Sequence, residues 1–308
     1  MEDRKLCDRR EFLKKSLVLS SAVIGAPLLG GVYKAFGQEA IPDLVAVRNG
    51  EPDKLFDAAI AAMGGMKRFV KPNQTVVIKP NIGWAREPET GANTNPLLIK
   101  RIIEHCKEAG AKKIYVFDNP VDDRQRCYQK SGIEQAAKDA GALVVPGDDD
   151  RHFQKITVPN GKTLKDAKVH ELILQSDVYI NVPVLKHHGS SGLTMAMKNQ
   201  MGIIRDRGTF HWSGLHQCIA DLCLFKKPDL NILDAYRVTL RNGPNRSRSE
   251  DVELKKSLLI SRDIVALDAA GAKMMGMEPE KINHIRFGHE MKIGNMNLDI
   301  LNIKKIAL

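Results

Sequence analysis

Residues 178–202 read VYINVPVLKHHGSSGLTMAMKNQMG and hold the most informative pattern in this 308-residue chain. An apolar, β-rich run at 178–184 predicts a buried strand. A lysine and two histidines follow this run, at 186–188. A Gly/Ser loop at 189–192 then leads into a segment with helical character. Open α/β sheets build ligand sites in this way, at the carboxyl ends of their strands. The pattern therefore predicts an α/β fold with a polar site at one sheet edge.

Strand and helix patterns alternate along the rest of the chain. Strands are expected at 44–47, 75–78, 114–117, 143–145, 230–233, 257–260 and 298–306. Helices are expected at 52–69, from Asn95-Pro96 to Gly110, from a Ser131-x-x-Glu134 capping box to Gly141, and at 192–204, 214–226 and 263–275. The segments that end at Gly110 and Gly141 repeat one βα pattern, which favours a parallel, doubly wound sheet.

Two further segments interrupt this alternation. Asn160-Gly161 predicts a hairpin between two α/β halves. The polar loop at 243–249 is expected to be mobile and to act as a lid. The sequence thus predicts a two-lobed α/β fold of mainly parallel sheets flanked by helices, with Rossmann-like repeats and lobes at 42–150 and 170–308.

The N-terminus has the order of features of an export signal. Arg9-Arg10 and the following Phe-Leu-Lys precede an apolar run at 17–32, and the small-x-small sequence at 35–37 offers a cleavage site. The paired arginines resemble the twin-arginine translocation signal, although Asp8 stands where Ser or Thr is usual. Residues 1–37 are therefore interpreted as a signal peptide and the protein as periplasmic or extracytoplasmic, exported folded. An uncleaved N-terminal membrane anchor is the alternative.

Composition restricts the classes of function. Aromatic residues make up only 5% of the chain and the net charge is +10, so an anionic small ligand fits better than a nucleic acid. The cysteines after residue 37 lack the dense C-x2-C-x2-C run of a ferredoxin cluster, which makes an intrinsic iron–sulfur cluster doubtful. Their helical spacing favours buried free thiols over disulfides.

Polar residues follow several of the expected strands. Lys79 and Asn81 follow one strand, Asp118-Asn119 another and Asp234 a third. Because carboxyl ends of parallel strands meet at one edge, these side chains are expected to converge in one cleft. The expected substrate-binding residues, which would hold an anion with help from the helix after Gly192, are Lys79, Asn81, Lys186, Asn199, Ser190 and Ser191. Solvated surface lysines are the alternative interpretation.

Histidines gather in the second half of the chain. Imidazole and carboxylate ligands suit Zn, Fe or Ni, and a divalent metal is expected to bind His187, His188 and His216. His187 and His188 would point to opposite sides of an extended chain, so only one should face the cleft. The expected catalytic residues are His211 as a general base, Asp234 as the group that orients it, and Lys198. Hydrogen-bonded structural histidines are the alternative.

Five sequence blocks carry a family resemblance. They are VVIKPN at 76–81, NVPVLKHH at 181–188, TMAMKNQMG at 194–202, LNILDA at 230–235 and IVALDAAGAKMMG at 264–276. Together they resemble the domain-of-unknown-function 362 family, over roughly residues 42–300. The resemblance implies that Lys79, Asn81, Lys186, Lys198, Asn199, Asp234 and Asp268 occupy the family's recurring polar positions.

The resemblance also bears on cofactors and partners. Many members carry an appended ferredoxin-type domain, and this chain lacks its cysteine run. The implied fold is similar to the two-lobed arrangement of the nickel-pincer lactate racemase family. We expect an exported enzyme that acts on a small anionic substrate with a metal or redox cofactor. The alternative is a non-catalytic periplasmic subunit that binds an anion or serves a cluster-bearing redox partner.

Overall fold

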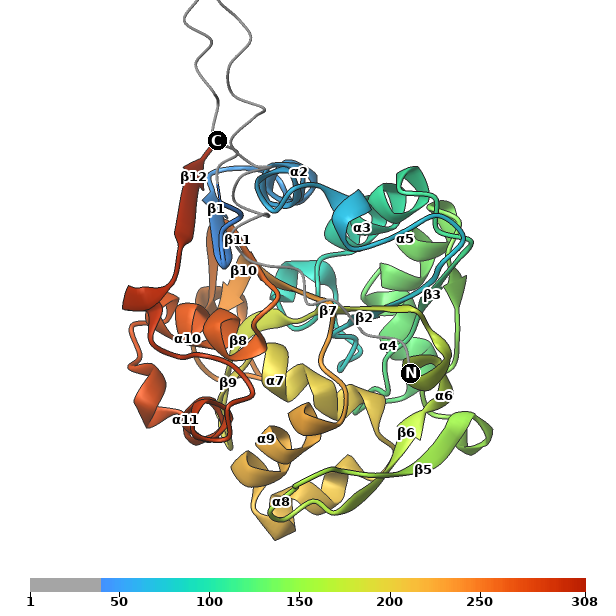
Figure 1. Cartoon of the computed structure of the whole chain (residues 1–308), viewed down its shortest axis with the longest axis vertical. Coiled ribbons are helices and arrows are strands. Elements are labelled where there is room, and N and C mark those ends of the chain that lie inside the picture. Colours follow the sequence, from blue (N-terminus) through green and yellow to red (C-terminus); the bar gives the residue numbers. More distant parts are fainter. Residues whose placement is uncertain (1–39) are drawn as a thin grey trace, which may run out of the picture. The chain divides into compact units, whose positions relative to one another are not determined.

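A mixed, largely parallel β-sheet is the centre of the computed structural model, which describes residues 40–308 (Figure 1). The expected signal peptide at 1–37 lies outside the described residues. Within residues 41–308, the strands are β1 (Leu44–Arg48), β2 (Thr75–Pro80), β3 (Lys113–Val116), β4 (Leu143–Val144), β5 (Phe153–Thr157), β6 (Asp166–His170), β7 (Val178–Val182), β8 (Val184–His188), β9 (Gly192–Thr194), β10 (Leu230–Thr239), β11 (Val252–Ser261) and β12 (Ile303–Ala307).

Helices connect most of these strands. They are α2 (Pro52–Ala62), α3 (Pro96–Glu108), α4 (Arg124–Lys130), α5 (Ile133–Asp139), α6 (Glu171–Gln175), α7 (Ala196–Asn199), α8 (Phe210–Ser213), α9 (Leu215–Phe225), α10 (Ile264–Met274) and α11 (Asn283–Glu290). The capping signals that the sequence offers at two helices are confirmed. Asn95 accepts a hydrogen bond from Leu97 N, and Asp263 accepts from Val265 N and Ala266 N.

The strand order of the sheet is β12-β1-β11-β10-β7-β2-β3-β4. The run from β10 to β4 is parallel, while β11 is antiparallel to both of its neighbours, β10 and β1. This confirms the α/β class with a largely parallel sheet flanked by helices.

The sheet is continuous across the two expected lobes. β2 belongs to the segment 42–150 and β7 to the segment 170–308, yet the two strands pair from Val76↔Val178 to Pro80↔Val182. Both strands are apolar on both faces, so they bury most surface in the middle of one sheet. Residues 41–308 form one compact unit, and this single sheet runs through both of the segments expected as lobes.

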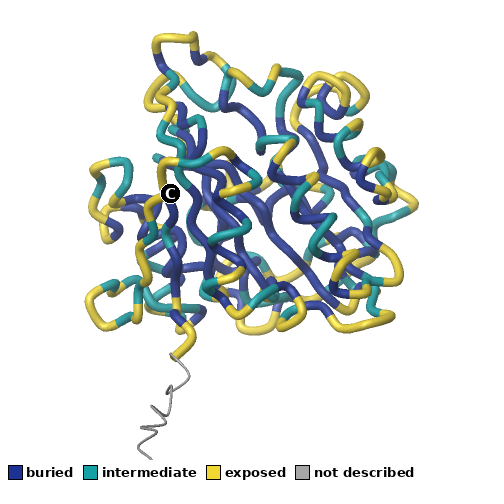
Figure 2. Tube along the Cα trace, turned by 90° about the horizontal axis from the view of Figure 1, so that it is seen from above, coloured by how far each residue is buried: buried dark blue, intermediate teal, exposed yellow. Residues whose placement is uncertain are grey.

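Two apolar cores lie on the opposite faces of this sheet. Val76 and Ile78 face the core covered by α2, α3 and α5, whereas Val77, between them, faces the core covered by α7, α9, α10 and α11. Figure 1 shows the two groups of helices on opposite sides of the strands, and Figure 2 shows the buried strands between exposed loops. The result is a three-layer α/β/α arrangement.

The hairpin around Asn160-Gly161 is present and stands outside the main sheet. β5 and β6 form a separate antiparallel two-stranded sheet. Asn160 has a φ of 58°, the left-handed conformation that Asn and Gly tolerate in tight turns.

Some elements differ from the sequence-based expectation. The helix expected at 52–69 ends at Ala62, because Gly64 and Gly65 adopt φ values of 92° and 83°, which no α-helix can contain. The capping box at Ser131 does not form, since α5 starts after Gly132 without a side-chain cap. Ser131 Oγ instead donates to Tyr128 O at the end of α4.

The polar run at 186–188 is also placed differently. It forms the end of β8, which pairs with β9 from Lys186↔Thr194 to His188↔Gly192. The expected loop at 189–192 is thus a hairpin turn, and the helix that follows is only the short α7. No helix among residues 40–308 is long and apolar enough to cross a membrane.

Candidate functional site

A polar cleft of about 690 Å³ lies beyond the carboxyl ends of β2 and β3. Its wall includes the strand-end residues Lys79, Asn81 and Asp118 and the first turn of chain after them. The β8–β9 hairpin, α7 and the segments 201–211 and 243–246 complete it. The convergence of strand ends that a parallel sheet predicts is therefore present at this edge.

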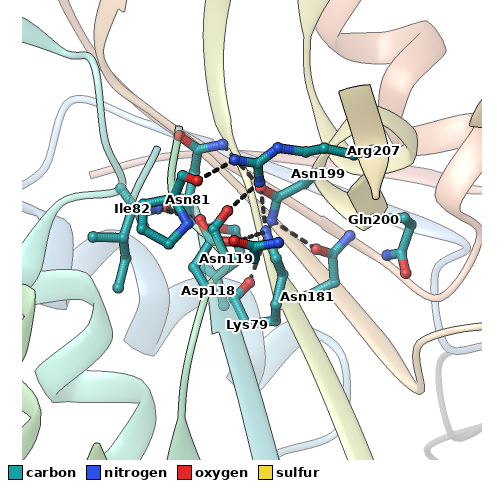
Figure 3. Close-up of polar contacts among 12 residues, drawn as sticks. Lys79, Asn81, Ile82, Asp118, Asn119, Asn181, Asn199, Gln200 and Arg207 are labelled. Atoms are coloured by element: carbon teal, nitrogen blue, oxygen red, sulfur yellow. Dashed lines mark hydrogen bonds and ion pairs between the residues drawn. The ribbon is translucent and has the colours of Figure 1, made fainter. Parts of the chain in front are cut away.

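Lys79 and Asp118 form a buried ion pair at the floor of the cleft. Lys79 Nζ lies 2.8 Å from Asp118 Oδ1, and both side chains are almost fully shielded from solvent. Asp118 Oδ2 accepts a hydrogen bond of 2.6 Å from Ile82 N (Figure 3). Burial lowers the pKa of Lys79, and the Asp118 carboxylate opposes this shift. The charge of each partner is thus already neutralised within the protein.

Asparagine amides connect this pair to the centre of the sheet. Asn199 Oδ1 accepts from Lys79 Nζ at 2.8 Å and from Asn81 Nδ2 at 3.0 Å. Asn199 Nδ2 donates to Asn181 Oδ1 at 2.9 Å (Figure 3). Asn181 Nδ2 in turn donates to Asn231 Oδ1 at 2.9 Å. We call Asn81, Asn181, Asn199 and Asn231 the amide network. It fixes α7 against β2, β7 and β10 without any net charge.

Lys186 on β8 is buried and bound only to neutral acceptors. Its Nζ donates to Asn81 Oδ1 at 3.0 Å and to the carbonyl oxygen of Ala92. Burial, followed by the charge of Lys198, lowers the pKa of Lys186 to about 7. The side chain is therefore held in place by dipoles rather than by a carboxylate.

Lys198 on α7 also lines the cleft and is half-buried. Within residues 40–308, its Nζ takes part in no hydrogen bond and no ion pair. Burial, followed by the charges of Arg207 and Lys79, lowers its pKa to about 8. Of the cations in the cleft that are shielded from solvent, this ammonium has the fewest compensating contacts, whereas Arg246 is exposed.

Arg207 completes the cationic wall. Its guanidinium donates to the carbonyl oxygens of Asn119 and Pro120, which fixes its plane above the end of β3 (Figure 3). Burial lowers its pKa from the ordinary value, but an arginine stays charged at physiological pH. Arg207 therefore adds a permanent positive charge next to Lys198.

Two histidines line the cleft. His188 Nδ1 accepts from Ser190 N and Ser191 N at 3.2 and 3.3 Å, so its neutral ring carries its proton on Nε2. Burial and the nearby lysines lower its pKa to about 2. His211 is exposed, and burial followed by Lys198 and Arg207 lowers its pKa as well. Both imidazoles are neutral near pH 7.

The structure brings together most of the residues that the sequence indicates. The cleft contains Lys79, Asn81, Lys186, Ser190, Lys198, Asn199, His188 and His211. His187 does not line it, which agrees with the alternation expected for an extended chain. Ser191 is buried away from it, and its Oγ donates to Leu193 O at 3.0 Å.

Asp234 does not orient a base in this cleft. Its Oδ2 accepts from Asn95 N at 2.7 Å, and its Oδ1 accepts from Tyr236 N at 3.0 Å. Oδ2 thus holds the start of α3 against β10, and Oδ1 is occupied by a backbone N–H of β10 itself. This is a correction of the expected catalytic role, and the reason is that β10 continues to Thr239 instead of ending at Leu233.

The three histidines expected to hold a metal are not brought together. His216 Nδ1 lies 3.0 Å from His284 Nδ1, and the two rings stack between α9 and α11. Within residues 40–308, no group of three or more His, Cys, Asp or Glu side chains could hold a metal ion.

The expected helix N-terminus is not available to an anion either. The first N–H groups of α7, on Ala196 and Met197, donate to the two oxygens of Asp268 at 2.6 and 2.9 Å. Asp268, from α10, thus occupies the position that a ligand was expected to take. The four described cysteines, Cys106, Cys127, Cys218 and Cys223, are free and buried as expected.

Three residues that shape the cleft had no role among the expected site residues. Asp118, two residues after β3, was expected to reach the cleft with the other strand ends, but no role was assigned to it. Arg207 lies in a short polar turn without any regular spacing, so no sequence pattern marks it. Gly202 packs against the ion pair, because a Cβ there would lie 1.9 Å from Asp118 Oδ1 and 2.5 Å from Lys79 Nζ.

Comparisons with known proteins find similar sequences and folds. The thylakoid-associated protein sll1697 of Synechocystis sp. (strain ATCC 27184 / PCC 6803 / Kazusa) is 26% identical over 229 residues, which cover 71% of this chain and 68% of the relative. The lactate racemase apoprotein of Thermoanaerobacterium thermosaccharolyticum has a TM-score of 0.48 at 13% identity, covering 75% of this chain and 56% of that one.

A protein from Thermotoga maritima has a TM-score of 0.43 at 13% identity, with 78% of this chain and 60% of that chain covered. This chain therefore spans less than two thirds of the length of either solved structure. A family model described as Domain of unknown function (DUF362) matches residues 76–273. Since this match includes β2, β3, β7, β8, α7 and most of the cleft, the chain belongs to the DUF362 family.

Proposed function

We propose that this protein binds a small anion, a carboxylate or a phosphate, in the cleft and acts on it as an enzyme. The observation that carries the proposal is the unpaired ammonium of Lys198. It lies in a cleft with Lys186, Arg207 and Arg246. Among the described residues that line this cleft, Asp118 is the only carboxylate, and Lys79 already neutralises it.

The electrostatic balance of the cleft supports an anionic ligand. Burying like charges beside one another is costly unless a counter-charge is present, and none of residues 40–308 offers one to Lys198. A bound anion would supply it and would accept hydrogen bonds from Lys198 and Arg207. Charge-assisted bonds of this type are about twice as strong as neutral ones.

Neutral imidazoles beside the cations support catalysis in addition to binding. His211 lines the same cleft, and its lowered pKa leaves it able to accept a proton near pH 7. It is the most plausible general base among the described residues of the cleft. Asp234 plays no part in this proposal.

Calorimetric titration of phosphate, acetate and lactate into the protein tests the binding. We expect Lys198→Met to weaken binding tenfold or more, because one charged hydrogen bond contributes about 1.5–3 kcal/mol. Lys162→Met is the matched control, since Lys162 is exposed on the β5–β6 hairpin, and it should bind like the wild type. Equal affinity in all three proteins would overturn the proposal.

The pH dependence gives a second readout. The anion binds the protonated form of Lys198, so its affinity should fall as pH rises from 7 to 9, through the pKa of about 8. Binding should also take up protons at pH 8, which calorimetry in buffers of different ionisation enthalpy measures. His211→Ala should lower turnover of an identified substrate more than it lowers affinity.

A location outside the cytoplasm is part of the proposal. The twin-arginine pattern at Arg9-Arg10 supports it, and so does the relative described as thylakoid-associated. Cell fractionation of the wild type and of a variant with both arginines changed to lysine tests it. Export that persists in the double variant would exclude the twin-arginine route.

A non-catalytic subunit is the second candidate. Its support is the set of four buried, free cysteines, which are not arranged to hold a cluster, so that electrons would come from another chain. Co-purification with a cluster-bearing partner would favour this candidate. Turnover of an anionic substrate by the isolated chain would exclude it.

A further inference from the structure

The three lysines of the cleft differ in what occupies their amino groups. Lys79 Nζ is paired with a carboxylate at 2.8 Å. Lys186 Nζ donates to the oxygens of Asn81 and Ala92. For Lys198 Nζ, residues 40–308 provide neither an acceptor nor a counter-charge. Only Lys198 has an amine whose approach to a ligand is free of competing contacts.

The surroundings of Lys198 increase the fraction of its amine that is unprotonated. The loss of solvent, followed by the charges of Arg207 and Lys79, acts against protonation. With a pKa of about 8, roughly a tenth of this amine is unprotonated at pH 7, against less than about a thousandth for an exposed lysine. A lysine that is desolvated beside another cation is activated as a nucleophile toward carbonyl groups.

We propose that Lys198 is a carbonyl-reactive amine that forms an imine with an anionic carbonyl compound, such as a 2-oxo acid, bound in the cleft. The inference rests on the proposed function, because the same cations would hold the carboxylate of the ligand. It adds the substrate class and the reacting atom.

The step balances with groups that the cleft contains. Lys198 Nζ attacks the carbonyl carbon, a C–N bond forms, and the carbonyl oxygen gains a proton to give a carbinolamine. The nitrogen then loses its remaining proton, the hydroxyl group leaves as water, and a C=N bond remains. His211, on the same wall, would take the proton from the nitrogen and return it to the departing oxygen.

The fixed positions of Lys186 and Arg207 give the ligand one orientation. Arg207 is held by two backbone carbonyls and Lys186 by two acceptors, so neither needs to reorganise when a carboxylate arrives. A ligand carboxylate beside these cations would leave the adjacent carbonyl carbon to Lys198. A 2-oxo acid fits this arrangement, because its carboxylate and its carbonyl group are on neighbouring carbon atoms.

Reductive trapping tests the inference. The full-length protein is incubated with pyruvate or glyoxylate and sodium cyanoborohydride, and its peptides are mapped by mass spectrometry. We expect one dominant adduct, on Lys198, with labelling at least tenfold above that of any other lysine. Lys198→Arg should abolish this adduct, whereas Lys162→Arg should retain it.

The peptide map of the wild type decides the matter even if a variant fails to fold. Adducts spread over exposed lysines, or no adduct at all, would overturn the inference. The rate of trapping at Lys198 should rise with a midpoint near pH 8, while that of exposed lysines rises only toward pH 10.

A parallel titration separates this inference from the proposed function. Lactate has the carboxylate of pyruvate but no reactive carbonyl. If lactate binds and pyruvate leaves no adduct on Lys198, the anion site stands and the imine does not. If neither lactate nor phosphate binds, the proposed function itself fails.

Discussion

Asp118 uses its two oxygens for two different purposes at the floor of the cleft. Oδ1 neutralises Lys79, and Oδ2 binds Ile82 N and so fixes the chain that leaves β2. Losing one partner of a buried ion pair costs more than losing both, because the remaining charge has no compensation. The pair should therefore behave as a unit when it is mutated.

Asp118→Asn should destabilise the protein by about 3–5 kcal/mol, because it leaves Lys79 charged and buried. Adding Lys79→Met should recover part of this loss. Urea denaturation of the wild type, both single variants and the double variant measures the coupling between the two residues. Additive effects of the two substitutions would show that the pair is not a unit.

Gly202 gives a second test at the same place. Gly202→Ala would place a Cβ 1.9 Å from Asp118 Oδ1, and overpacking of this kind costs about 1–3 kcal/mol. Gly208→Ala is the control, since a Cβ there meets nothing within 4 Å. Thermal unfolding and anion titration of both variants should show losses for Gly202→Ala only.

Some residues of the candidate site could be predicted from the sequence and others could not. Lys79, Asn81 and Lys186 could be predicted because each follows or ends an apolar strand. Arg207 could not, because it reaches the cleft from a turn whose path depends on contacts far along the chain, at Asn119 and Pro120. Asp234 was misassigned because the length of its strand is set by pairing with β11, which no local pattern records.

Among the elements, α7 depends on α10. The four residues of α7 form too short a helix to be stable alone, and Asp268 on α10 binds its first two N–H groups. Because α7 carries both Lys198 and Asn199, the position of the free amine is set by a side chain that lies outside the cleft.

Asp268→Ala should therefore lower both stability and anion affinity. We expect a loss of about 1–3 kcal/mol in the free energy of unfolding, because two buried N–H groups lose their acceptor. Asp263→Ala is the control on the same helix, where it removes the cap of α10 itself. It should cost about 1 kcal/mol and leave anion affinity unchanged.

The β8–β9 hairpin shows the limit of prediction at the scale of elements. A Gly/Ser run between an apolar segment and a helical segment is equally compatible with a loop and with a turn. The choice depends on whether the flanking residues find pairing partners, and β8 finds one in β10 through Asp234↔Val184. The strand β9 at Gly192–Thr194, where a helix was expected, could therefore not be predicted from the local pattern.

For the whole molecule, the alternation of strands and helices was sufficient to predict the α/β class and its parallel sheet. It did not reveal that one sheet runs through both halves, because strand order depends on contacts distant in sequence. The antiparallel β11 joins β1 to β10 and so brings the N-terminal strand to the C-terminal half.

Two lysines of the cleft should make contributions to the stability of the molecule that rise with pH above neutrality. Lys198 has a pKa of about 8 and Lys186 of about 7 in the folded state, against ordinary values near 10.5. On these two groups the unfolded chain therefore holds more protons between pH 7 and 10, so their contribution to stability rises with pH. The buried cysteines act in the opposite direction above about pH 8, because burial raises the pKa of their thiols in the folded state.

Lys198→Met isolates this effect. At pH 7 it should stabilise the ligand-free protein by about 1–2 kcal/mol, because it removes a desolvated charge that solvent screens only in part. The advantage should shrink toward pH 10. Urea denaturation at several pH values measures it, and a constant difference from pH 7 to 10 would contradict the assignment of the shift to Lys198.

The amide network has a consequence for how such a site could choose its ligands. Carboxamides neither gain nor lose protons at any pH at which the protein is folded, so the frame of the cleft keeps its shape while the lysines within it change charge. Two ligands of the same shape but different acidity therefore meet a cleft whose shape stays the same while its electrostatic potential changes with pH. The acidity of the surrounding compartment can thus govern which of them is retained, without any movement of the chain.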